Sequence, residues 1–481
     1  MLTGAEEPPL QESEGPYERR SACNGRGAKG PREMDGVTDP TTDLTPAHVP
    51  REASPAGEIR DRWSWVEPCV WTDRMLTALE QGVRGGRWFS LVDKVYALPT
   101  LWAAFARVKA NDGAAGVDHG TVAMYEARLE ANLTELATSL RTGTYRPQAI
   151  RRHWIPKPGT TEQRPLGIPT VRDRIVQTAL RLVLEPIFEQ GFAPQSYGFR
   201  PRRSTRHALR RVEALLQGGA VHVVDADFQA YFDRIPRAPL RAAVQAKVSD
   251  GRVLALLDAF LSQEIFDGLA SWTPEAGTPQ GAVVSPLLAN IYLDALDHLM
   301  VAEGFEMVRY ADDLVVLCAT ESEAQRALAV LHGWTHAAGL QLHPQKTRLV
   351  DVRQPGGFDF LGYHFERGYR WPRAKSIRKF KDTLRRKTRR THGESLAVII
   401  ADVNRSARGW FGYFQHSHWT TFPALDAWLR MRLRSILRTR ARRRGRGRGA
   451  DHHRWPNAFF AAHGLFTMTT AHALAVQSSM R

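Results

Sequence analysis

The sequence is poor in cysteine and lacks several signatures of metal and nucleophile chemistry. Its 481 residues include three cysteines, Cys23, Cys69 and Cys318, and no CxxC pair, which excludes a zinc ribbon and predicts a reducing, cytoplasmic environment. There is no P-loop, no GxSxG elbow and no HExxH motif. No apolar run approaches the roughly 18–20 residues that span a bilayer. The first 20 residues have no basic start followed by an apolar segment, so no membrane partner and no secretory signal are predicted.

Acidic residues are scarce in only one part of the chain. The whole chain has 66 Lys and Arg and 50 Asp and Glu, which gives a net charge of +16. Residues 366–449 contain 24 Lys and Arg but 5 Asp and Glu, whereas the rest of the chain contains 42 Lys and Arg and 45 Asp and Glu. So concentrated a charge predicts a surface for a polyanion, most plausibly nucleic acid, with an anionic membrane surface as the alternative. Embedded Trp and Phe residues can stack on bases.

Hydrophobic patterning predicts an ordered chain after a long polar tail. Residues 1–60 are rich in Gly, Pro, Glu and Ser and are predicted to be disordered. Beyond them, the order strand, helix, hairpin, helix, strand predicts an α+β domain with helices on one face of a sheet. Helices are expected over residues 122–140, 171–186, 287–300, 321–338, 372–390, 395–414 and 422–443.

Two adjacent acids, Asp312 and Asp313, interrupt a pair of apolar runs. Met307-Val308 precedes them and residues 314–317 follow, a pattern that predicts a β-hairpin with both carboxylates at or beside the turn. Alone, such a pair is typical of a solvated turn. Acids between two buried strands are costly unless they are paired or bound to a metal, which favours a divalent-ion site.

A third carboxylate is needed to complete such a site. Asp227 ends a β-branched run that begins at Val221, and Tyr231-Phe232 follows it. Asp225 and Asp233 are alternatives that the pattern does not exclude. Three carboxylates can hold two Mg²⁺ ions about 3.5–4 Å apart, which is the requirement of a two-metal polymerase.

Two further segments have residues suited to nucleotides. Lys157 and Arg164 flank a Gly-containing turn, which can close over phosphates or can be an exposed basic loop. Residues 277–281, GTPQG, precede the helix that begins near Ser285. They form either a structural turn or a place where the backbone approaches a base pair closely, as glycine permits.

Taken together, these motifs resemble the bacterial group II intron reverse transcriptase/maturases, of the endonuclease-less type. The resemblance covers about Trp63 to the C-terminus, and the motifs occur in the family's order. They are GAAGVD at 113–118, IPKP at 155–158, RPLGIPT at 164–170, SYGFRP at 196–201, ADF at 226–228 with YFD at 231–233, TPQG at 278–281, SPLLANIY at 285–292, YADD at 310–313, KT at 346–347, FDFLGY at 358–363 and RGWFGYF at 408–414.

The resemblance implies a right-hand polymerase. Fingers and palm are expected over residues 61–365, an all-α thumb/maturase (X) domain over 366–440, and a basic C-terminal tail with possible DNA binding over 441–481. The implied function is RNA-directed DNA synthesis, together with binding of the parent intron RNA, assistance to its splicing and copying of it into DNA at a target site (retrohoming). The implied partners are intron RNA, target DNA and dNTPs; no oligomeric state is indicated.

The resemblance also assigns roles to individual residues. Asp227, Asp312 and Asp313 become ligands of two Mg²⁺ ions, and Phe232 becomes the residue that blocks a 2′-hydroxyl. Contacts to the incoming dNTP fall to Lys157, Arg164, Phe228, Phe232 and Gln280. Contacts to template, primer or intron RNA fall to Arg200, Lys346, Arg378, Lys379, Arg385, Arg386, Arg408 and Trp410.

The sequence departs from the family pattern in two places, and two other interpretations compete with this one. No cysteine follows Cys318, so the Cys-containing HNH endonuclease of many members is expected to be absent. Phe228-Gln229 stands where relatives often have Ile-Lys, and activity is expected to survive. A maturase with a dormant polymerase is disfavoured by the complete carboxylate set. A retron or defence-associated reverse transcriptase is disfavoured by the maturase-like segment after Arg367.

Overall fold

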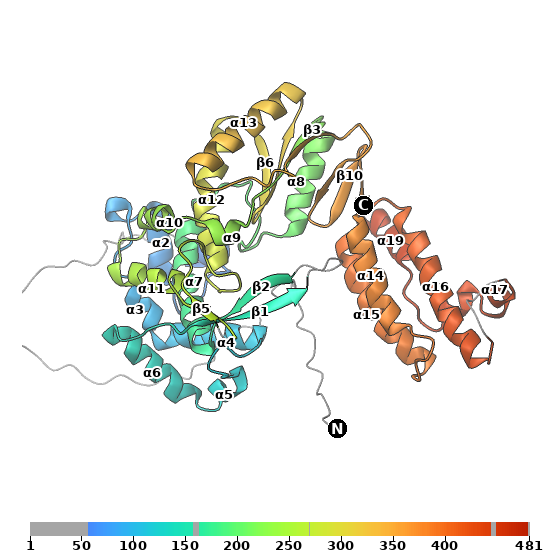
Figure 1. Ribbon diagram of the computed structural model, residues 1–481, viewed down its shortest axis with the longest axis horizontal. Helices are drawn as coiled ribbons and strands as arrows, with labels where there is room; N and C mark the ends of the chain where they lie inside the picture. The colour runs from blue at the N-terminus through green and yellow to red at the C-terminus, as the bar shows by residue number, and fades with distance from the viewer. Residues whose placement is uncertain (1–55, 157–162, 269, 444–448, 480–481) are drawn as a thin grey trace, which may run out of the picture. The chain divides into compact units, whose positions relative to one another are not determined.

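The computed structural model describes residues 56–156, 163–268, 270–443 and 449–479 (Figure 1). These residues form two compact units. Unit 1 contains the described residues within 1–153, 165–192 and 235–292, and unit 2 contains those within 154–164, 193–234 and 293–481. Lys157 and most of the predicted N-terminal tail lie outside the described residues.

Unit 1 is mainly helical and is built around one long buried helix, α7 (Val171–Glu189). Thr170 caps this helix as predicted, because its hydroxyl accepts a hydrogen bond from the Asp173 amide. The other helices are α1 (Ala56–Arg62), α2 (Asp73–Gln81), α3 (Val92–Tyr96), α4 (Leu98–Asn111), α5 (Val122–Glu126), α6 (Leu129–Thr142), α10 (Arg237–Gln245) and α11 (Gly251–Leu261). A four-stranded sheet has the order β2-β1-β4-β5, with strands β1 (Ile150–Pro156), β2 (Gln163–Ile168), β4 (Ile265–Asp267) and β5 (Ala270–Trp272).

Three predicted boundaries in this region are wrong. The last residues of the predicted tail belong to helix α1, which begins at Ala56 and buries Ile59. The helix predicted over 122–140 is two helices, since Arg128 has non-helical backbone angles. The helix that follows Thr170 does not end at Pro186 but continues through it to Glu189; the buried apolar side chains around this last turn supply packing that outweighs the lost hydrogen bond.

Unit 2 contains a four-stranded antiparallel sheet, here called the palm sheet. Its order is β6-β7-β3-β8. The strands are β3 (His222–Asp227), β6 (Glu306–Tyr310), β7 (Asp313–Cys318) and β8 (Arg348–Asp351). The predicted hairpin is thus present as β6 and β7. The helices of this region are α8 (Thr205–Gln217), α9 (Tyr231–Arg234), α12 (Ser285–Ala302), which starts in unit 1, and α13 (Glu321–Ala337).

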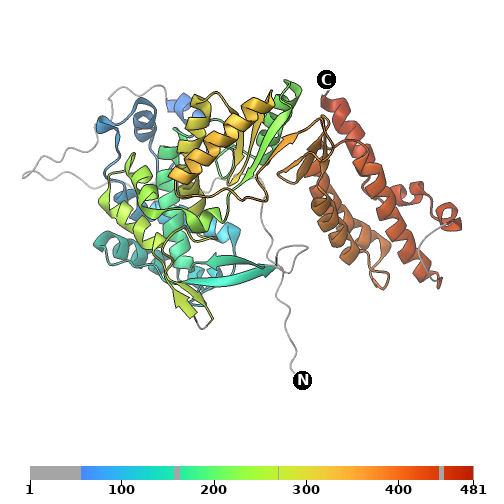
Figure 2. The same ribbon diagram turned by 45° about the horizontal axis from the view of Figure 1, so that its top comes forward.

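Helices cover both faces of the palm sheet, and not one face as predicted. The side chains of Val223, Val308 and Val315 form one core with α8. Helix α13 contacts β3, β7 and β8 but contributes no residue to that core. Because neighbouring strand residues point to opposite faces, α13 packs on the other face (Figure 2).

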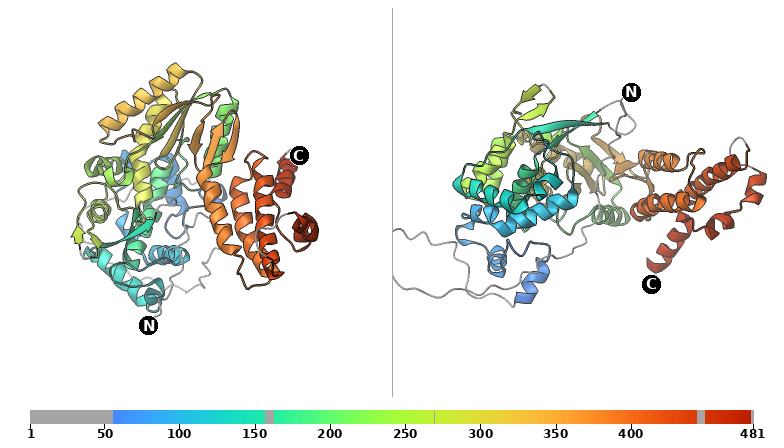
Figure 3. Two further views of the ribbon diagram at one scale, coloured as in Figure 1. Left: turned by 45° about the vertical axis from the view of Figure 1, so that its right-hand side comes forward. Right: turned by 90° about the horizontal axis from the view of Figure 1, so that it is seen from below.

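A second, three-stranded sheet connects the palm sheet to the C-terminal helices. It has the order β11-β10-β9, with strands β9 (Phe358–Phe360), β10 (Tyr363–Glu366) and β11 (Tyr369–Pro372). The three helices predicted after it are confirmed as α14 (Ala374–Lys387), α15 (Leu396–Phe414) and α16 (Thr421–Arg440). Figure 3 shows these helices side by side. They are called the thumb helices below.

The last described residues pack onto the thumb helices. Helices α17 (Ala450–Arg454), α18 (Asn457–Ala462) and α19 (Met468–Ser479) follow residues 444–448 of the basic run, which lie outside the described residues. Phe460, Leu465 and Met468 join the same hydrophobic core as Leu429 and Leu433 of α16. The predicted division at residue 440 therefore falls within one packed core. None of the helices that the structure describes is both long and apolar enough to cross a membrane.

Candidate active site

The palm sheet brings Asp227 and Asp313 directly opposite each other. Asp227 is the last residue of β3 and Asp313 the first of β7, and the antiparallel register pairs the two residues. Residues paired across a sheet project from the same face. Asp312 lies in the two-residue turn between Tyr310 and Asp313, which are paired with each other. One strand end and one hairpin turn thus bring the three carboxylates to the same end of the palm sheet.

The charges at this position are crowded. Loss of solvent around the carboxylate, together with the charges of Asp312 and Asp227, raises the pKa of Asp313 to about 7. Burial and the charge of Asp227 also raise the pKa of Asp312. The Asp313 side chain nevertheless remains open to solvent, so an ion or substrate can reach it. Neighbouring carboxylates that resist ionisation gain most from a nearby cation.

Basic side chains partly balance the three carboxylates. Lys346 Nζ lies 2.5 Å from a carboxylate oxygen of Asp227, and both Lys346 and Arg164 lower the pKa of Asp312. Arg373, at the start of α14, does the same for Asp313. Lys346 was predicted to contact nucleic acid, and the structure places it at the carboxylates themselves.

The donor set fits magnesium that is shared with a substrate. All three groups are hard oxygen ligands, and Mg²⁺ is commonly held by one or two carboxylates together with phosphates. Within the described residues, no group of three His, Cys, Asp or Glu side chains is placed to hold a metal by itself. Phosphate oxygens would therefore have to complete the coordination.

The two alternatives to Asp227 are distinguished by their surroundings. Asp225 lies two residues earlier on the same face of β3, but its carboxylate is 3.1 Å from Arg348 Nε on the neighbouring strand. Asp233 lies on the short helix α9, outside the palm sheet. Only Asp227 stands opposite Asp313 in the sheet register.

The residues predicted to bind dNTP fall into different environments. Arg164 is exposed on β2 and acts electrostatically on Asp312. Phe232 is half-buried, with its ring edge-on to Tyr231 at 5.5 Å. Phe228 is fully buried against Tyr231, which leaves its ring inside the core. Gln280 belongs to unit 1, where its carbonyl accepts from the Gly167 amide at 2.7 Å.

The GTPQG segment makes its close approach within the protein. A Cβ atom added at Gly281 would overlap the carbonyl oxygen of Gly167, and Gly281 has a φ of +98°. Both facts require glycine at this position. The close partner identified by the structure is thus the backbone of the RPLGIP strand.

Five of the residues predicted to bind RNA are exposed on the thumb helices. These are Arg378, Lys379, Arg385, Arg386 and Arg408. Trp410 instead stacks on Phe380 at 4.5 Å in the thumb core. Tyr413 Oη, from the same RGWFGYF motif, donates to the Leu361 carbonyl at 2.7 Å. The motif therefore joins α15 to the three-stranded sheet.

Arg200 also has a different place from the one predicted. Its side chain is buried, and Nη1 donates to the carbonyls of Ala193 and Ser196 at 2.6 and 2.9 Å. Sequence reasoning in turn missed Arg309 and Asp297, a fully buried ion pair. The available signal was a charged residue within each of two mainly apolar segments.

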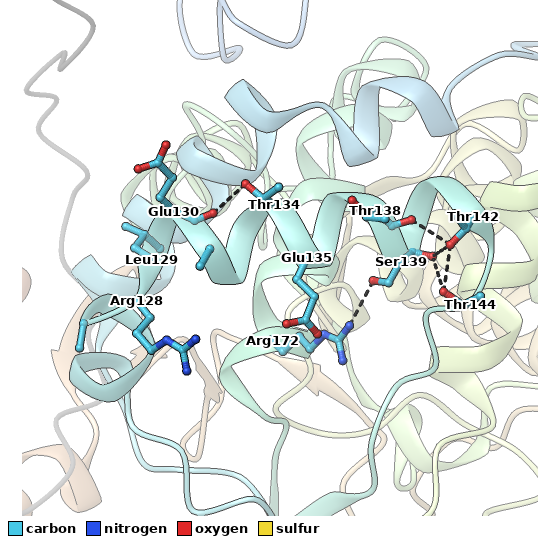
Figure 4. A pocket seen from close by; sticks show the side chains of 12 residues that line it. Arg128, Leu129, Glu130, Thr134, Glu135, Thr138, Ser139, Thr142, Thr144 and Arg172 are labelled. Atoms are coloured by element: carbon cyan, nitrogen blue, oxygen red, sulfur yellow. Dashed lines mark hydrogen bonds between the residues drawn. The ribbon is translucent and has the colours of Figure 1, made fainter.

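A large hollow among the described residues lies on unit 1 and contains none of the predicted site residues. It has a volume of about 1090 Å³ and follows α6 from Arg128 to Thr144. Figure 4 shows hydroxyls and two acids along the helix, with Arg172 donating to Ser139 Oγ. Of the two arginines that line the cavity, Arg172 already donates to Ser139 within the protein.

Comparison with known proteins agrees with the geometry. Residues 155–365 match the family of reverse transcriptases (RNA-dependent DNA polymerases), and residues 377–455 match the maturase-specific domain of group II introns. Protein YkfC of Escherichia coli K12 is 31% identical over 350 residues, which cover 63% of this chain and 86% of YkfC.

Group II intron-encoded protein LtrA of Lactococcus lactis is 39% identical over 171 residues, covering 36% of this chain and 28% of LtrA. The putative COX1/OXI3 intron 1 protein of Saccharomyces cerevisiae is 24% identical over 377 residues, covering 66% of this chain and 44% of that protein. The matched region thus spans most of YkfC but less than half of these two intron proteins. The chain belongs to the family of group II intron-encoded reverse transcriptase/maturases.

Proposed function

We propose that this family member is an RNA-directed DNA polymerase that copies a group II intron RNA into DNA with Asp227, Asp312 and Asp313 as its metal ligands. The observation that carries the proposal is the pairing of Asp227 with Asp313 beside the turn that holds Asp312. Two Mg²⁺ ions would supply activation of a primer 3′-hydroxyl and neutralisation of the departing pyrophosphate.

The protein's own residues would prepare this site for the triphosphate. Arg164 and Lys346 reduce the negative charge around Asp312, which lowers the repulsion that an incoming polyphosphate meets. Lys346 must leave Asp227 when an ion binds there, and its long side chain can then reach a phosphate. Lys157 and Gln280 receive their assignment to the dNTP from the motif match alone.

The thumb helices are proposed to bind the intron RNA. These helices belong to the basic segment of the sequence, and Arg378, Lys379 and Arg386 are exposed on α14. Next to them, Trp428 of α16 has the cations of Lys381, Arg385 and Arg432 over its ring at 5.6–5.9 Å. Exposed cations beside an aromatic ring suit a phosphodiester chain and its bases. Splicing assistance and insertion at a DNA target are part of this proposal.

Primer extension tests the polymerase proposal directly. The full chain should extend a DNA primer on an RNA template when dNTPs and Mg²⁺ are present, and excess EDTA should stop synthesis. Binding of a group II intron RNA should be measured in the same preparation. Tight RNA binding without any extension would reject the polymerase and favour a maturase with a dormant site.

Phe232 offers a test of sugar selection. Replacing Phe232 by Ala should increase the use of ribonucleotides relative to deoxynucleotides by about 10- to 100-fold, because steric exclusion of one small group is worth that much. The measurement compares kcat/KM for a dNTP and the matching rNTP. Phe89→Ala, at a similarly sized ring that is 40% exposed on unit 1, is the control and should leave the ratio unchanged. An unaltered ratio in Phe232→Ala would contradict the gate.

A further inference from the structure

The turn that holds Asp312 is supported from inside the protein by a buried arginine. Arg309, on β6, and Asp297, on α12, have fully buried side chains and form a two-pronged ion pair. Arg309 Nε donates to one carboxylate oxygen at 2.7 Å, and Nη2 donates to the other. Nη2 also donates to Ser196 Oγ at 2.8 Å. Such a planar fork fixes the guanidinium in one orientation.

The third nitrogen of the Arg309 guanidinium group reaches the turn itself. Arg309 Nη1 donates to the carbonyl oxygen of Ala311 at 2.9 Å. That carbonyl belongs to the peptide bond that joins Ala311 to Asp312, so its direction sets the direction of the Asp312 backbone amide. Ala311 has a φ of +59°, a left-handed conformation that is unfavourable for alanine. The arginine therefore holds a turn that the local sequence alone does not favour.

A second segment supports the turn from its edge. The Arg309 amide donates to the Gln195 carbonyl at 3.0 Å, and the Tyr197 amide donates to the Arg309 carbonyl at 2.8 Å. Gly198 comes next, and a Cβ atom placed on it would overlap the backbone nitrogen of Ala311. Glycine is thus required here by the close approach of the catalytic turn.

The two supports act on successive peptides of the turn. Arg309, whose side chain is anchored by Asp297 of α12, bonds to the Ala311–Asp312 peptide. Gly198 packs against the Tyr310–Ala311 peptide. Neither residue is placed to touch a nucleotide, because both Arg309 and Gly198 are buried. We infer that Arg309, oriented by Asp297 and Ser196, is a positioning residue for Asp312, with Gly198 fixing the other side of the turn. This inference rests on the proposed polymerase function.

Removing the charges of both Asp297 and Arg309 distinguishes a positioning role from a role in folding. A buried ion pair whose members are both replaced by apolar residues of similar size commonly leaves a folded protein, whereas a single replacement leaves an unpaired charge. The double variant Asp297→Leu with Arg309→Met should therefore fold while losing the contact to Ala311. At saturating substrates its kcat should fall by about 100-fold, since a misplacement of about 1 Å in a reacting group has that effect. KM for dNTP and affinity for the primer–template should change little.

Two readouts besides activity locate the change at the turn. Hydrogen exchange of the peptide that contains residues 310–313 should accelerate by about tenfold in the double variant, because local opening becomes easier. Peptides from the thumb helices should be unaffected. Binding of Mn²⁺, measured by electron paramagnetic resonance, should weaken because the carboxylates are no longer held in place.

Two further variants test the positioning role independently of the double variant. Gly198→Ala leaves Arg309 and Asp297 intact but pushes on the turn, and it should show the same kcat loss with little change in KM. Arg309→Lys keeps a positive charge for Asp297 but cannot also reach Ala311. This variant should therefore fold, and its kcat should be reduced as in the double variant. The matched control is Arg211→Met with Glu306→Leu, which removes an exposed ion pair between α8 and β6 and should leave kcat unchanged.

The outcomes are distinct. Wild-type kcat and unchanged exchange at residues 310–313 in a folded double variant or in Gly198→Ala would overturn the positioning role. If the double variant does not fold, Arg309→Lys and Gly198→Ala decide by the same two readouts. The polymerase proposal is tested separately by comparing the wild-type chain with Asp312→Asn. If the wild type synthesises DNA and Asp312→Asn does not, the polymerase stands even where the positioning role of Arg309 fails.

Discussion

Replacing Asp312 by Asn should abolish DNA synthesis while leaving RNA binding intact. Asparagine keeps the shape of the side chain but removes the negative charge, and a neutral amide is a poor Mg²⁺ ligand. A loss of about 10³-fold or more in the single-turnover rate is expected when a charge that stabilises the transition state is removed. RNA affinity should be preserved because the cations of the thumb helices are unchanged. Rapid-quench primer extension and filter binding measure the two properties separately.

The Asp312→Asn substitution should also change the pKa of the neighbouring Asp313. Asp312 is one of the charges that raise the pKa of Asp313 to about 7, so this pKa should fall in Asp312→Asn. The pH dependence of residual Mn²⁺ binding reports that shift. Asp351→Asn is the control, because Asp351 lies on β8 of the same sheet and is paired with Arg353. Parallel loss of synthesis and RNA binding in Asp312→Asn would show a folding defect and would remove support for the assigned role.

The hairpin and the kind of site could be predicted from local pattern. Apolar runs on both sides of Asp312 and Asp313 define two strands and a turn, and a run of β-branched residues before Asp227 defines a third. Which of Asp225, Asp227 and Asp233 completes the set depends on register. A shift of two residues in the pairing of β3 and β7 would place Asp225 opposite Asp313, and nothing local to either strand prevents it. Only the motif match or the folded sheet identifies Asp227.

Side-chain contacts that a motif does not show explain why Arg200 and Trp410 lie inside the fold and not on its surface. Arg200 and Trp410 occur in motifs whose basic and aromatic residues suggest a nucleic-acid surface. In the structure, Arg200 donates to the carbonyls of Ala193 and Ser196, and Trp410 stacks on Phe380. A sequence pattern does not reveal whether a guanidinium points to solvent or to a backbone carbonyl a few residues away. The continuation of α7 through Pro186 has the same origin, because tertiary packing outweighed a local preference.

Neutralising the exposed cations of α14 should reduce both the affinity for intron RNA and its salt dependence. The variant Arg378→Gln, Lys379→Gln and Arg386→Gln removes three charges for which the described residues show no ion-pair partner. Each lost phosphate contact should lower the slope of log K against log salt by about 0.7–0.9, so a reduction of about 2 is expected. Affinity should fall by about 10²-fold at low salt. Binding measured from 50 to 300 mM KCl by fluorescence anisotropy gives both quantities.

The control removes the same net charge from the palm sheet and its helices. Arg211, Arg326 and Arg353 contact Glu306, the ring of Phe305 and Asp351, so their charges already serve partners within the protein. Replacing these three by Gln should lower the slope by less than the α14 variant does. An equal reduction in both variants would indicate a general effect of net charge. An unchanged slope in the α14 variant would place the RNA surface elsewhere, even if primer extension established the polymerase. The two proposed activities are expected to separate, because the carboxylates belong to the palm sheet and its hairpin whereas Arg378, Lys379 and Arg386 belong to the thumb helices.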